Sequence, residues 1–183
     1  AVLCLQWQII RRIDDVMKLA KSTLMFNSCE PSTLNIKMNW SKNIREERDC
    51  PMQIVFGAMD PLVCPLLNLA AWLEGGDYHG LLLFGSHRTN SAVSSLLDKI
   101  FSSELFRRVR TLGLLGTHFI CKCATSYAAC FGMMRDWICS CGRWRMKKQQ
   151  VDTYIEMMLP YPDALVASVL TGPQGPCKYA VKG

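Results

Sequence analysis

The sequence predicts a mostly α-helical α+β domain with a small antiparallel β-meander near the N-terminus. Apolar residues recur at helical spacing through most of the chain, whereas residues 34–40 alternate between apolar and polar side chains. The chain has 183 residues, half of them apolar and a fifth charged, which is typical of one globular domain. We therefore expect a single domain over residues 1–183, with a core over about 1–159 and a C-terminal tail over 160–183.

The N-terminal third is expected to contain helices followed by the meander. Residues 3–19 carry apolar side chains at helical spacing and predict one or two helices. The alternating run 34–40 predicts a strand with one buried face, and short β-prone runs at 22–26 and 52–56 flank it. These three strands would form the antiparallel sheet.

Helices are expected to follow the meander. Asp60 before Pro61 is typical of an N-cap and a first-turn proline, which predicts a helix that stops at Gly75 and Gly76. Capping residues and apolar stripes predict four further helices. They cover about residues 90–110, 117–129, 151–158 and 163–170. The first would be capped by Asn90 or Ser91 and the second by Thr117.

Basic side chains concentrate between residues 107 and 148. This segment holds nine lysines and arginines and one acid, a local formal charge of +8, whereas the whole chain carries +6. Such a segment favours a polyanionic partner, because neutralised phosphates release counterions, but it is also typical of a solvated basic face. The basic run of Arg143, Arg145, Lys147 and Lys148 is expected to contact DNA phosphates without reading base sequence.

Two function classes are excluded by the same sequence. No apolar run reaches the roughly 18 residues that a membrane span needs, and Gln6 and Gln8 interrupt the apolar N-terminus where a signal peptide would lie. The ten cysteines are spread through helix-like segments of a chain too long for a small disulfide scaffold. We therefore expect a soluble intracellular protein with reduced thiols.

Five polar or reactive residues occur in an order and context that carry the functional prediction. They are Arg12 in Arg-Ile-Asp-Asp, Lys42 in Trp-Ser-Lys-Asn, His118 in His-Phe-Ile-Cys-Lys, Trp144 in Gly-Arg-Trp and Tyr154 in Asp-Thr-Tyr-Ile. This arrangement resembles the catalytic domain of the tyrosine recombinases, the integrase family. The closing portion, from Cys-Gly-Arg-Trp to Pro-Tyr-Pro-Asp-Ala, looks most like the crypton-type recombinases of eukaryotic mobile elements.

The resemblance implies a catalytic role for each of the five residues. Arg12 would grip the scissile phosphate with its fork of donors, and Lys42 would protonate the leaving 5′ oxygen. His118 and Trp144 would hydrogen-bond the phosphate. Tyr154 would attack phosphorus and form a 3′-phosphotyrosine, which stores the bond energy, so that neither a metal nor another cofactor is required.

One position departs from the family pattern. The family has His-x-x-Arg, whose two side chains share one helix face, and Cys121 stands where that arginine is expected. A thiol lacks the reach, the charge and the paired donors of a guanidinium. By analogy with the loss of one oxyanion donor, we expect the chemical step to slow by about 10² to 10³ at least.

The resemblance also implies the setting in which the chain works. We expect double-stranded DNA as the partner, a tetramer on that DNA and a nuclear location, with neither a membrane nor a small-molecule substrate. The family's upstream DNA-clamping domain is expected to be absent from this chain. The implied activity is DNA recombination or integration by strand cleavage and rejoining, impaired at Cys121.

Each of these residues has an ordinary structural alternative. Arg12 could be a surface arginine paired with a nearby acid, Lys42 an exposed loop lysine, and His118 a helix-start histidine. Trp144 could fill a gap between helices, and Tyr154 could belong to the apolar stripe of its own helix.

Two alternatives concern the whole chain. The chain could be a decayed remnant of a mobile element that binds DNA without cleaving it. It could also be a structural zinc module, although the spacing of its candidate ligands lacks the paired knuckles of zinc ribbons; these are Cys121, Cys123, Cys130, Cys139 and Cys141.

Overall fold

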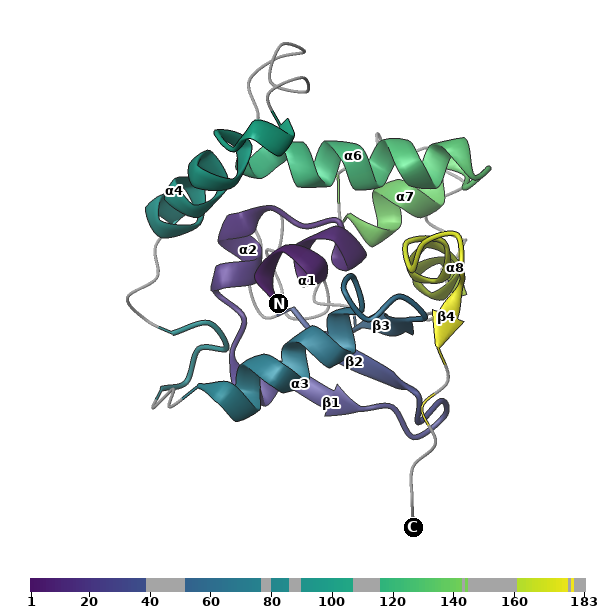
Figure 1. Cartoon of the computed structure of the whole chain (residues 1–183). Coiled ribbons are helices and arrows are strands. Elements are labelled where there is room, and N and C mark those ends of the chain that lie inside the picture. The colour runs from purple at the N-terminus through teal and green to yellow at the C-terminus, as the bar shows by residue number, and fades with distance from the viewer. Residues whose placement is uncertain are drawn as a thin grey trace.

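The computed structural model describes residues 1–38, 52–76, 80–85, 90–106, 116–142, 144, 161–177 and 179. In this part of the chain the fold is mixed α+β, with seven α-helices and one four-stranded antiparallel sheet (Figure 1). The helices are α1 (Val2–Ile9), α2 (Ile13–Met17), α3 (Pro65–Gly75), α4 (Asn90–Phe101), α6 (Thr117–Cys130), α7 (Arg135–Cys141) and α8 (Tyr161–Val169). Two 3₁₀ turns, η1 (Lys21–Thr23) and η3 (Glu104–Phe106), follow α2 and α4.

The sheet confirms the predicted meander. It has the order β1-β2-β3-β4, with β1 at Leu24–Phe26, β2 at Thr33–Lys37, β3 at Met52–Ala58 and β4 at Pro176–Cys177. Leu24 pairs with Ile36, and Leu34 pairs with Val55, so the three N-terminal strands are antiparallel neighbours. Ile36 and Val55 are buried in the core, as the alternating pattern predicts. Strand β4 was not predicted, since it lies in the Gly- and Pro-rich C-terminal segment.

Helix α1 runs through the middle of the molecule, between α3 and the sheet on one side and α6 on the other (Figure 1). Leu5 and Ile9 of α1 are buried in the main core cluster together with residues of α2, β2, β3 and α4. The predicted helical stretch 3–19 is split in two because Ile10 adopts the left-handed conformation, at φ 49° and ψ 44°. This break turns the chain so that α2 starts in a new direction.

The predicted start of α3 is wrong. Asp60 closes a turn instead, in which its Oδ1 accepts the Leu62 N–H at 2.9 Å and its carbonyl accepts the Val63 N–H at 3.3 Å. The helix begins at Pro65, where Cys64 is the N-cap and its sulfur accepts the Leu67 N–H at 3.4 Å. The chain thus offers two residue–proline pairs in succession, and the second starts the helix.

Other helix boundaries also differ from the predictions. Thr117 is the first residue of α6 and not its cap, because the cap is Gly116 and makes no side-chain bond. Helix α4 ends at Phe101, and α7 was not predicted. The predicted continuation over 107–110 and the predicted helix 151–158 lie outside the described residues.

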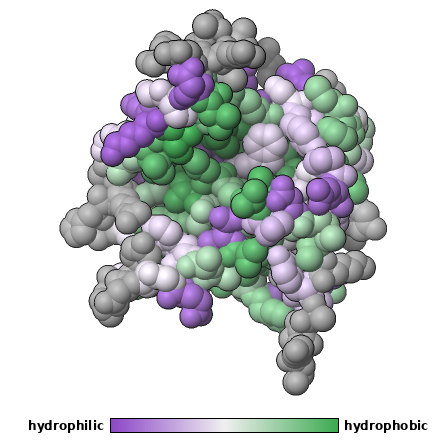
Figure 2. Space-filling view, in the orientation of Figure 1, coloured by the Kyte–Doolittle hydropathy of each residue, from purple (hydrophilic) through white to green (hydrophobic). Residues whose placement is uncertain are grey.

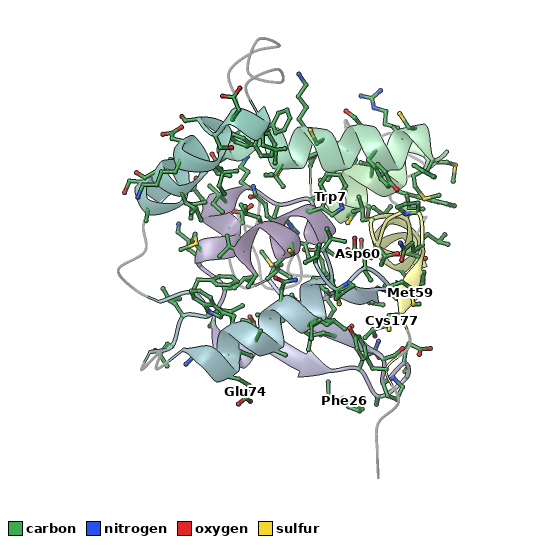
Figure 3. All side chains as sticks on the ribbon, viewed as in Figure 1. Trp7, Phe26, Met59, Asp60, Glu74 and Cys177 are labelled. Carbon is green, nitrogen blue, oxygen red and sulfur yellow. The ribbon has the colours of Figure 1, made fainter. Side chains whose placement is uncertain are left out.

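The segment after residue 160 contributes to the core. Helix α8 packs on α7 and β3, and Val166, Ala167 and Leu170 are buried. From α1, the Trp7 indole N–H donates to the Leu170 carbonyl at 2.9 Å, on the side facing α7 and α8 (Figure 3). These contacts join the two ends of the described chain.

An apolar groove of about 460 Å³ opens between α1, α3 and α4 (Figure 2). Its walls include Val2, Met17, Trp72, Val93 and Leu96. This face of the molecule therefore exposes apolar surface beside the start of α1. None of the described helices is long and apolar enough to cross a membrane.

Candidate functional site

The short link between α1 and α2 presents one arginine to solvent and buries the other. Arg12 is the N-cap of α2, with extended backbone at φ −64° and ψ 149°, and its carbonyl accepts the Asp15 N–H at 3.0 Å. Its side chain is exposed. Burial raises the pKa of Asp15 and the charge of Arg12 opposes that rise, so the Arg12 and Asp15 side chains interact electrostatically. The Arg12 guanidinium is thus held at the surface by a fixed backbone.

Arg11 is buried to 1% exposure, and Gln53 of β3 holds it. The Arg11 Nε donates to Gln53 Oε1 at 3.1 Å. The Gln53 amide nitrogen donates in turn to the Cys141 carbonyl at 2.7 Å and to the Ile9 carbonyl at 3.3 Å. One side chain therefore connects the ends of α1 and α7 to the link that carries Arg12.

The start of α6 is fastened to the same link through Cys121. The Cys121 Sγ donates to the Arg11 carbonyl at 2.6 Å and accepts from Gln6 Nε2 at 3.7 Å. Gln6 also donates to the Thr117 carbonyl at 2.9 Å. His118, one turn before Cys121, is exposed. The face of α6 that carries His118 and Cys121 is therefore hydrogen-bonded to the peptide group that joins Arg11 to Arg12.

Burial controls the electrostatics at this point. Burial raises the pKa of the Cys121 thiol, as does the charge of Asp15, while the Gln6 hydrogen bond and the two arginines lower it. Burial also raises the pKa of Asp15, and the charges of Arg11 and Arg12 oppose that rise. Cys121 therefore keeps its proton at neutral pH and acts as a hydrogen-bond donor.

Trp144 lies beside the same link from another direction. Its ring packs against a cluster of buried residues that includes Ile10 of the link, Ala124 of α6 and Cys141 of α7. A Cβ at Gly142 would lie 2.9 Å from Trp144 Cε2, so this ring position requires glycine. Trp144 therefore fills a gap between helices, as its structural alternative predicted.

Four predicted residues lie in the described part of the chain. Arg12 is on the α1–α2 link, His118 and Cys121 are on the first two turns of α6, which Cys121 bonds to that link, and Trp144 packs on the cluster that contains Ile10. The remaining predicted site residues, Lys42, Tyr154, Arg143, Arg145, Lys147 and Lys148, lie outside the described residues.

Sequence reasoning missed the buried polar residues that organise this region. Gln53 interrupts the β-prone run 52–56, and Gln6 and Gln8 interrupt an apolar helix. Those interruptions were the available signal, because a polar side chain on a buried face must find hydrogen-bond partners. In the structure Gln6 bonds to α6, Gln8 to the Ala167 carbonyl of α8, and Gln53 to Arg11.

The cysteines offer no metal centre in the described residues, where no three His, Cys, Asp or Glu side chains lie close enough to hold an ion. Of the five candidate zinc ligands, Cys121 and Cys141 are buried, and their sulfurs hydrogen-bond to the Arg11 carbonyl and the Gln53 amide. The thiols at these two positions serve the packing of α6 and α7.

Comparison of this chain with protein-family models, with curated proteins and with solved structures finds no match.

Alkylation should distinguish Cys121 from the exposed thiols. We expect iodoacetamide at pH 8 to label Cys121 at least about tenfold more slowly than Cys130, because burial keeps Cys121 protonated and Cys130 is exposed. Burial raises the pKa of Cys121, so the folded state holds the thiol proton more tightly than the unfolded state does. The stability that the protonated thiol contributes is therefore present below pH 9, and it is lost as the pH rises through the raised pKa. Peptide mapping of the labelled chain measures both rates. Equal labelling of the two thiols in folded protein would contradict the burial of Cys121.

Proposed function

We propose that this chain is a DNA-binding and strand-cleaving domain of the tyrosine recombinase type, impaired at one catalytic position. The observation that supports the proposal is the Cys121 Sγ–Arg11 carbonyl bond of 2.6 Å. It holds the first turn of α6, with exposed His118, against the link that presents Arg12. A single phosphate resting on this link could be approached by the side chains of both residues.

In this proposal the protein groups act in sequence on one phosphodiester. The Tyr154 phenol gives up its proton to solvent, its oxygen bonds to phosphorus, and the phosphorus–5′ oxygen bond breaks as the 5′ oxygen takes a proton from Lys42. The products are a 3′-phosphotyrosine and a free 5′ hydroxyl, and attack by a 5′ hydroxyl reverses the step. Arg12 and His118 would stabilise the charge on the nonbridging oxygens.

The impairment follows from the position of Cys121. Its neutral thiol donates a hydrogen bond to a backbone carbonyl and offers no positive charge to a phosphate. The loss favours the second candidate function, in which the domain binds DNA and no longer cleaves it.

A covalent trapping assay tests the proposal. The chain is incubated with a nicked duplex whose short 5′ product diffuses away, and protein joined to a 3′ end is detected on a denaturing gel. We expect a small amount of covalent complex that Tyr154→Phe abolishes. Duplex binding without any covalent complex would support the binding-only function, and neither binding nor complex would refute both.

Arg12 should contribute to DNA binding through direct phosphate contact. We expect Arg12→Ala to weaken duplex binding and to reduce the slope of log K against log salt concentration by about 1, because one phosphate contact is lost. Lys99→Ala is the matched control, since Lys99 is an exposed cation on α4. Fluorescence anisotropy over a salt series measures both slopes. An unchanged slope for Arg12→Ala would remove Arg12 from the interface.

A further inference from the structure

The C-terminal strand is held on the sheet by a tyrosine that lies against bare backbone. Cys177 pairs with Gly57, and the Met59 N–H donates to the Gly175 carbonyl at 3.2 Å. Figure 3 shows Cys177 and Met59 near each other at this edge. A Cβ on Gly57 would lie 2.5 Å from Tyr179 Cε2, so the ring rests where only glycine leaves room. We call Pro176, Cys177 and Tyr179 the strap.

The Tyr179 hydroxyl links the strap to a thiol that is far away in the sequence. Cys64 Sγ is 3.0 Å from the Tyr179 oxygen, and Cys177 lies two residues before Tyr179. The Cys64 hydrogen bond and partial burial raise the pKa of Tyr179, so the phenol stays protonated at neutral pH. Tyr179 thus joins the strand that carries Cys177, and its neighbour Gly57, to the start of α3 that carries Cys64. Tyr179 is 41% exposed, so its ring has solvent into which it can turn.

The two thiols differ in the way that a redox pair requires. Cys177 is partly exposed and reachable by a small oxidant, whereas Cys64 is fully buried. Cys64 sits at the N-terminus of the eleven-residue helix α3, where its sulfur accepts the Leu67 N–H.

We propose that Cys64 and Cys177 form a reversible disulfide that locks the strap onto the start of α3. The Cys177 thiolate attacks hydrogen peroxide, which breaks the O–O bond, gives a sulfenic acid and, with one proton, releases water. The Cys64 thiolate then attacks the Cys177 sulfur, forms the S–S bond and, with a second proton, releases a second water. Two thiols are oxidised and one peroxide is reduced. A dithiol reverses the reaction.

Cys4 is the neighbouring thiol that competes for Cys64. Its sulfur donates weakly to the Leu62 carbonyl at 3.9 Å, and the charge of Cys64 acts on it. Burial raises the pKa of Cys4, which disfavours its thiolate, although the N-terminal ammonium opposes that rise. We therefore expect Cys177, and not Cys4, to pair with Cys64.

Oxidation followed by peptide mapping tests the proposal on the full chain. Reduced protein is treated with one equivalent of hydrogen peroxide and quenched with an alkylating agent. We expect a Cys64–Cys177 disulfide peptide and an intact mass lower by two hydrogens, both reversed by dithiothreitol. Amide exchange at Met59 and Cys177 should slow by about tenfold in the oxidised protein, because the strap can no longer lift away.

Variants separate this pair from general thiol oxidation. Tyr179→Phe, which keeps the ring and removes the hydroxyl, should speed disulfide formation, and so should Gly57→Ala, which displaces the ring. Cys177→Ser should abolish the disulfide, whereas Cys29→Ser, at an exposed thiol, should leave it unchanged. A Cys4–Cys64 disulfide, or oxidation of Cys29 without a Cys64–Cys177 disulfide in folded wild-type protein, would overturn the proposal.

Discussion

Replacing Cys121 with arginine is expected to increase the amount of covalent protein–DNA complex by about 10²- to 10³-fold. This is the range expected when one hydrogen-bond donor to a reacting oxygen is restored. The side chain of residue 121 starts 8% exposed beside the Arg11 carbonyl, with exposed His118 one turn away. An arginine is long enough to extend past this carbonyl, and in the proposed site its donors would lie beside Arg12. The trapping assay on the nicked duplex measures the gain.

Controls separate the restored donor from added charge. Cys121→Lys brings a positive charge without paired donors and should recover much less. Cys121→Arg combined with Tyr154→Phe should give no covalent product. Because a large side chain replaces a buried thiol, we expect Cys121→Arg to lower the free energy of unfolding by about 1 to 3 kcal/mol. A folded Cys121→Arg protein that binds DNA and traps none of it would argue against the assigned roles of Arg12, His118 and Tyr154.

Replacing Gln53 with methionine is expected to lower the free energy of unfolding by about 3 to 5 kcal/mol, a loss of roughly 10 °C in Tm. Methionine has a similar shape and makes none of the four hydrogen bonds that join Gln53 to Arg11, Ile9 and the carbonyl and sulfur of Cys141. The largest cost comes from the Arg11 guanidinium, because a buried cation loses a bonding partner. Chemical denaturation measures the change.

A double-mutant cycle identifies the source of that cost. Arg11→Met removes the buried charge, so the combined Arg11→Met and Gln53→Met variant should lose at least about 1 kcal/mol less than the two single variants together. Losses that add to within about 0.5 kcal/mol would show that Gln53 stabilises the fold independently of Arg11. Since Gln53 also supports the link that carries Arg12, duplex binding of the folded variants should be measured alongside.

The sequence predicted those elements in which local pattern and tertiary packing agree. The sequence of strand β2 alternates between polar and apolar residues, and Ile36 is buried in the core, as expected. The start of α3 was misplaced because Asp60–Pro61 satisfies the same local rule as Cys64–Pro65. Only packing against β3 and α1 distinguishes the two. A cysteine is also an uncommon helix cap, so propensity favours the wrong pair.

The candidate site divides in the same way. Arg12 and His118 were proposed as site residues from their order along the chain, and the structure bonds α6 to the link that carries Arg12. Arg11 and Gln53 were not identified, because a sequence shows Arg11 as one more surface cation. Its burial depends on a strand about forty residues later in the chain. Pairings between distant segments of this kind require the three-dimensional structure.

The bonds from α1 to α8 constrain how the chain acquires its fold during synthesis. The first helix donates from Trp7 and Gln8 to carbonyls of Leu170 and Ala167, almost the full length of the chain away. These two hydrogen bonds therefore cannot form until the segment after residue 160 has been synthesised, although Leu5 and Ile9 can pack earlier on elements up to α4. Closing such long loops is slow and leaves intermediates open to aggregation. Truncation before residue 161 should accordingly yield insoluble material that chaperones retain.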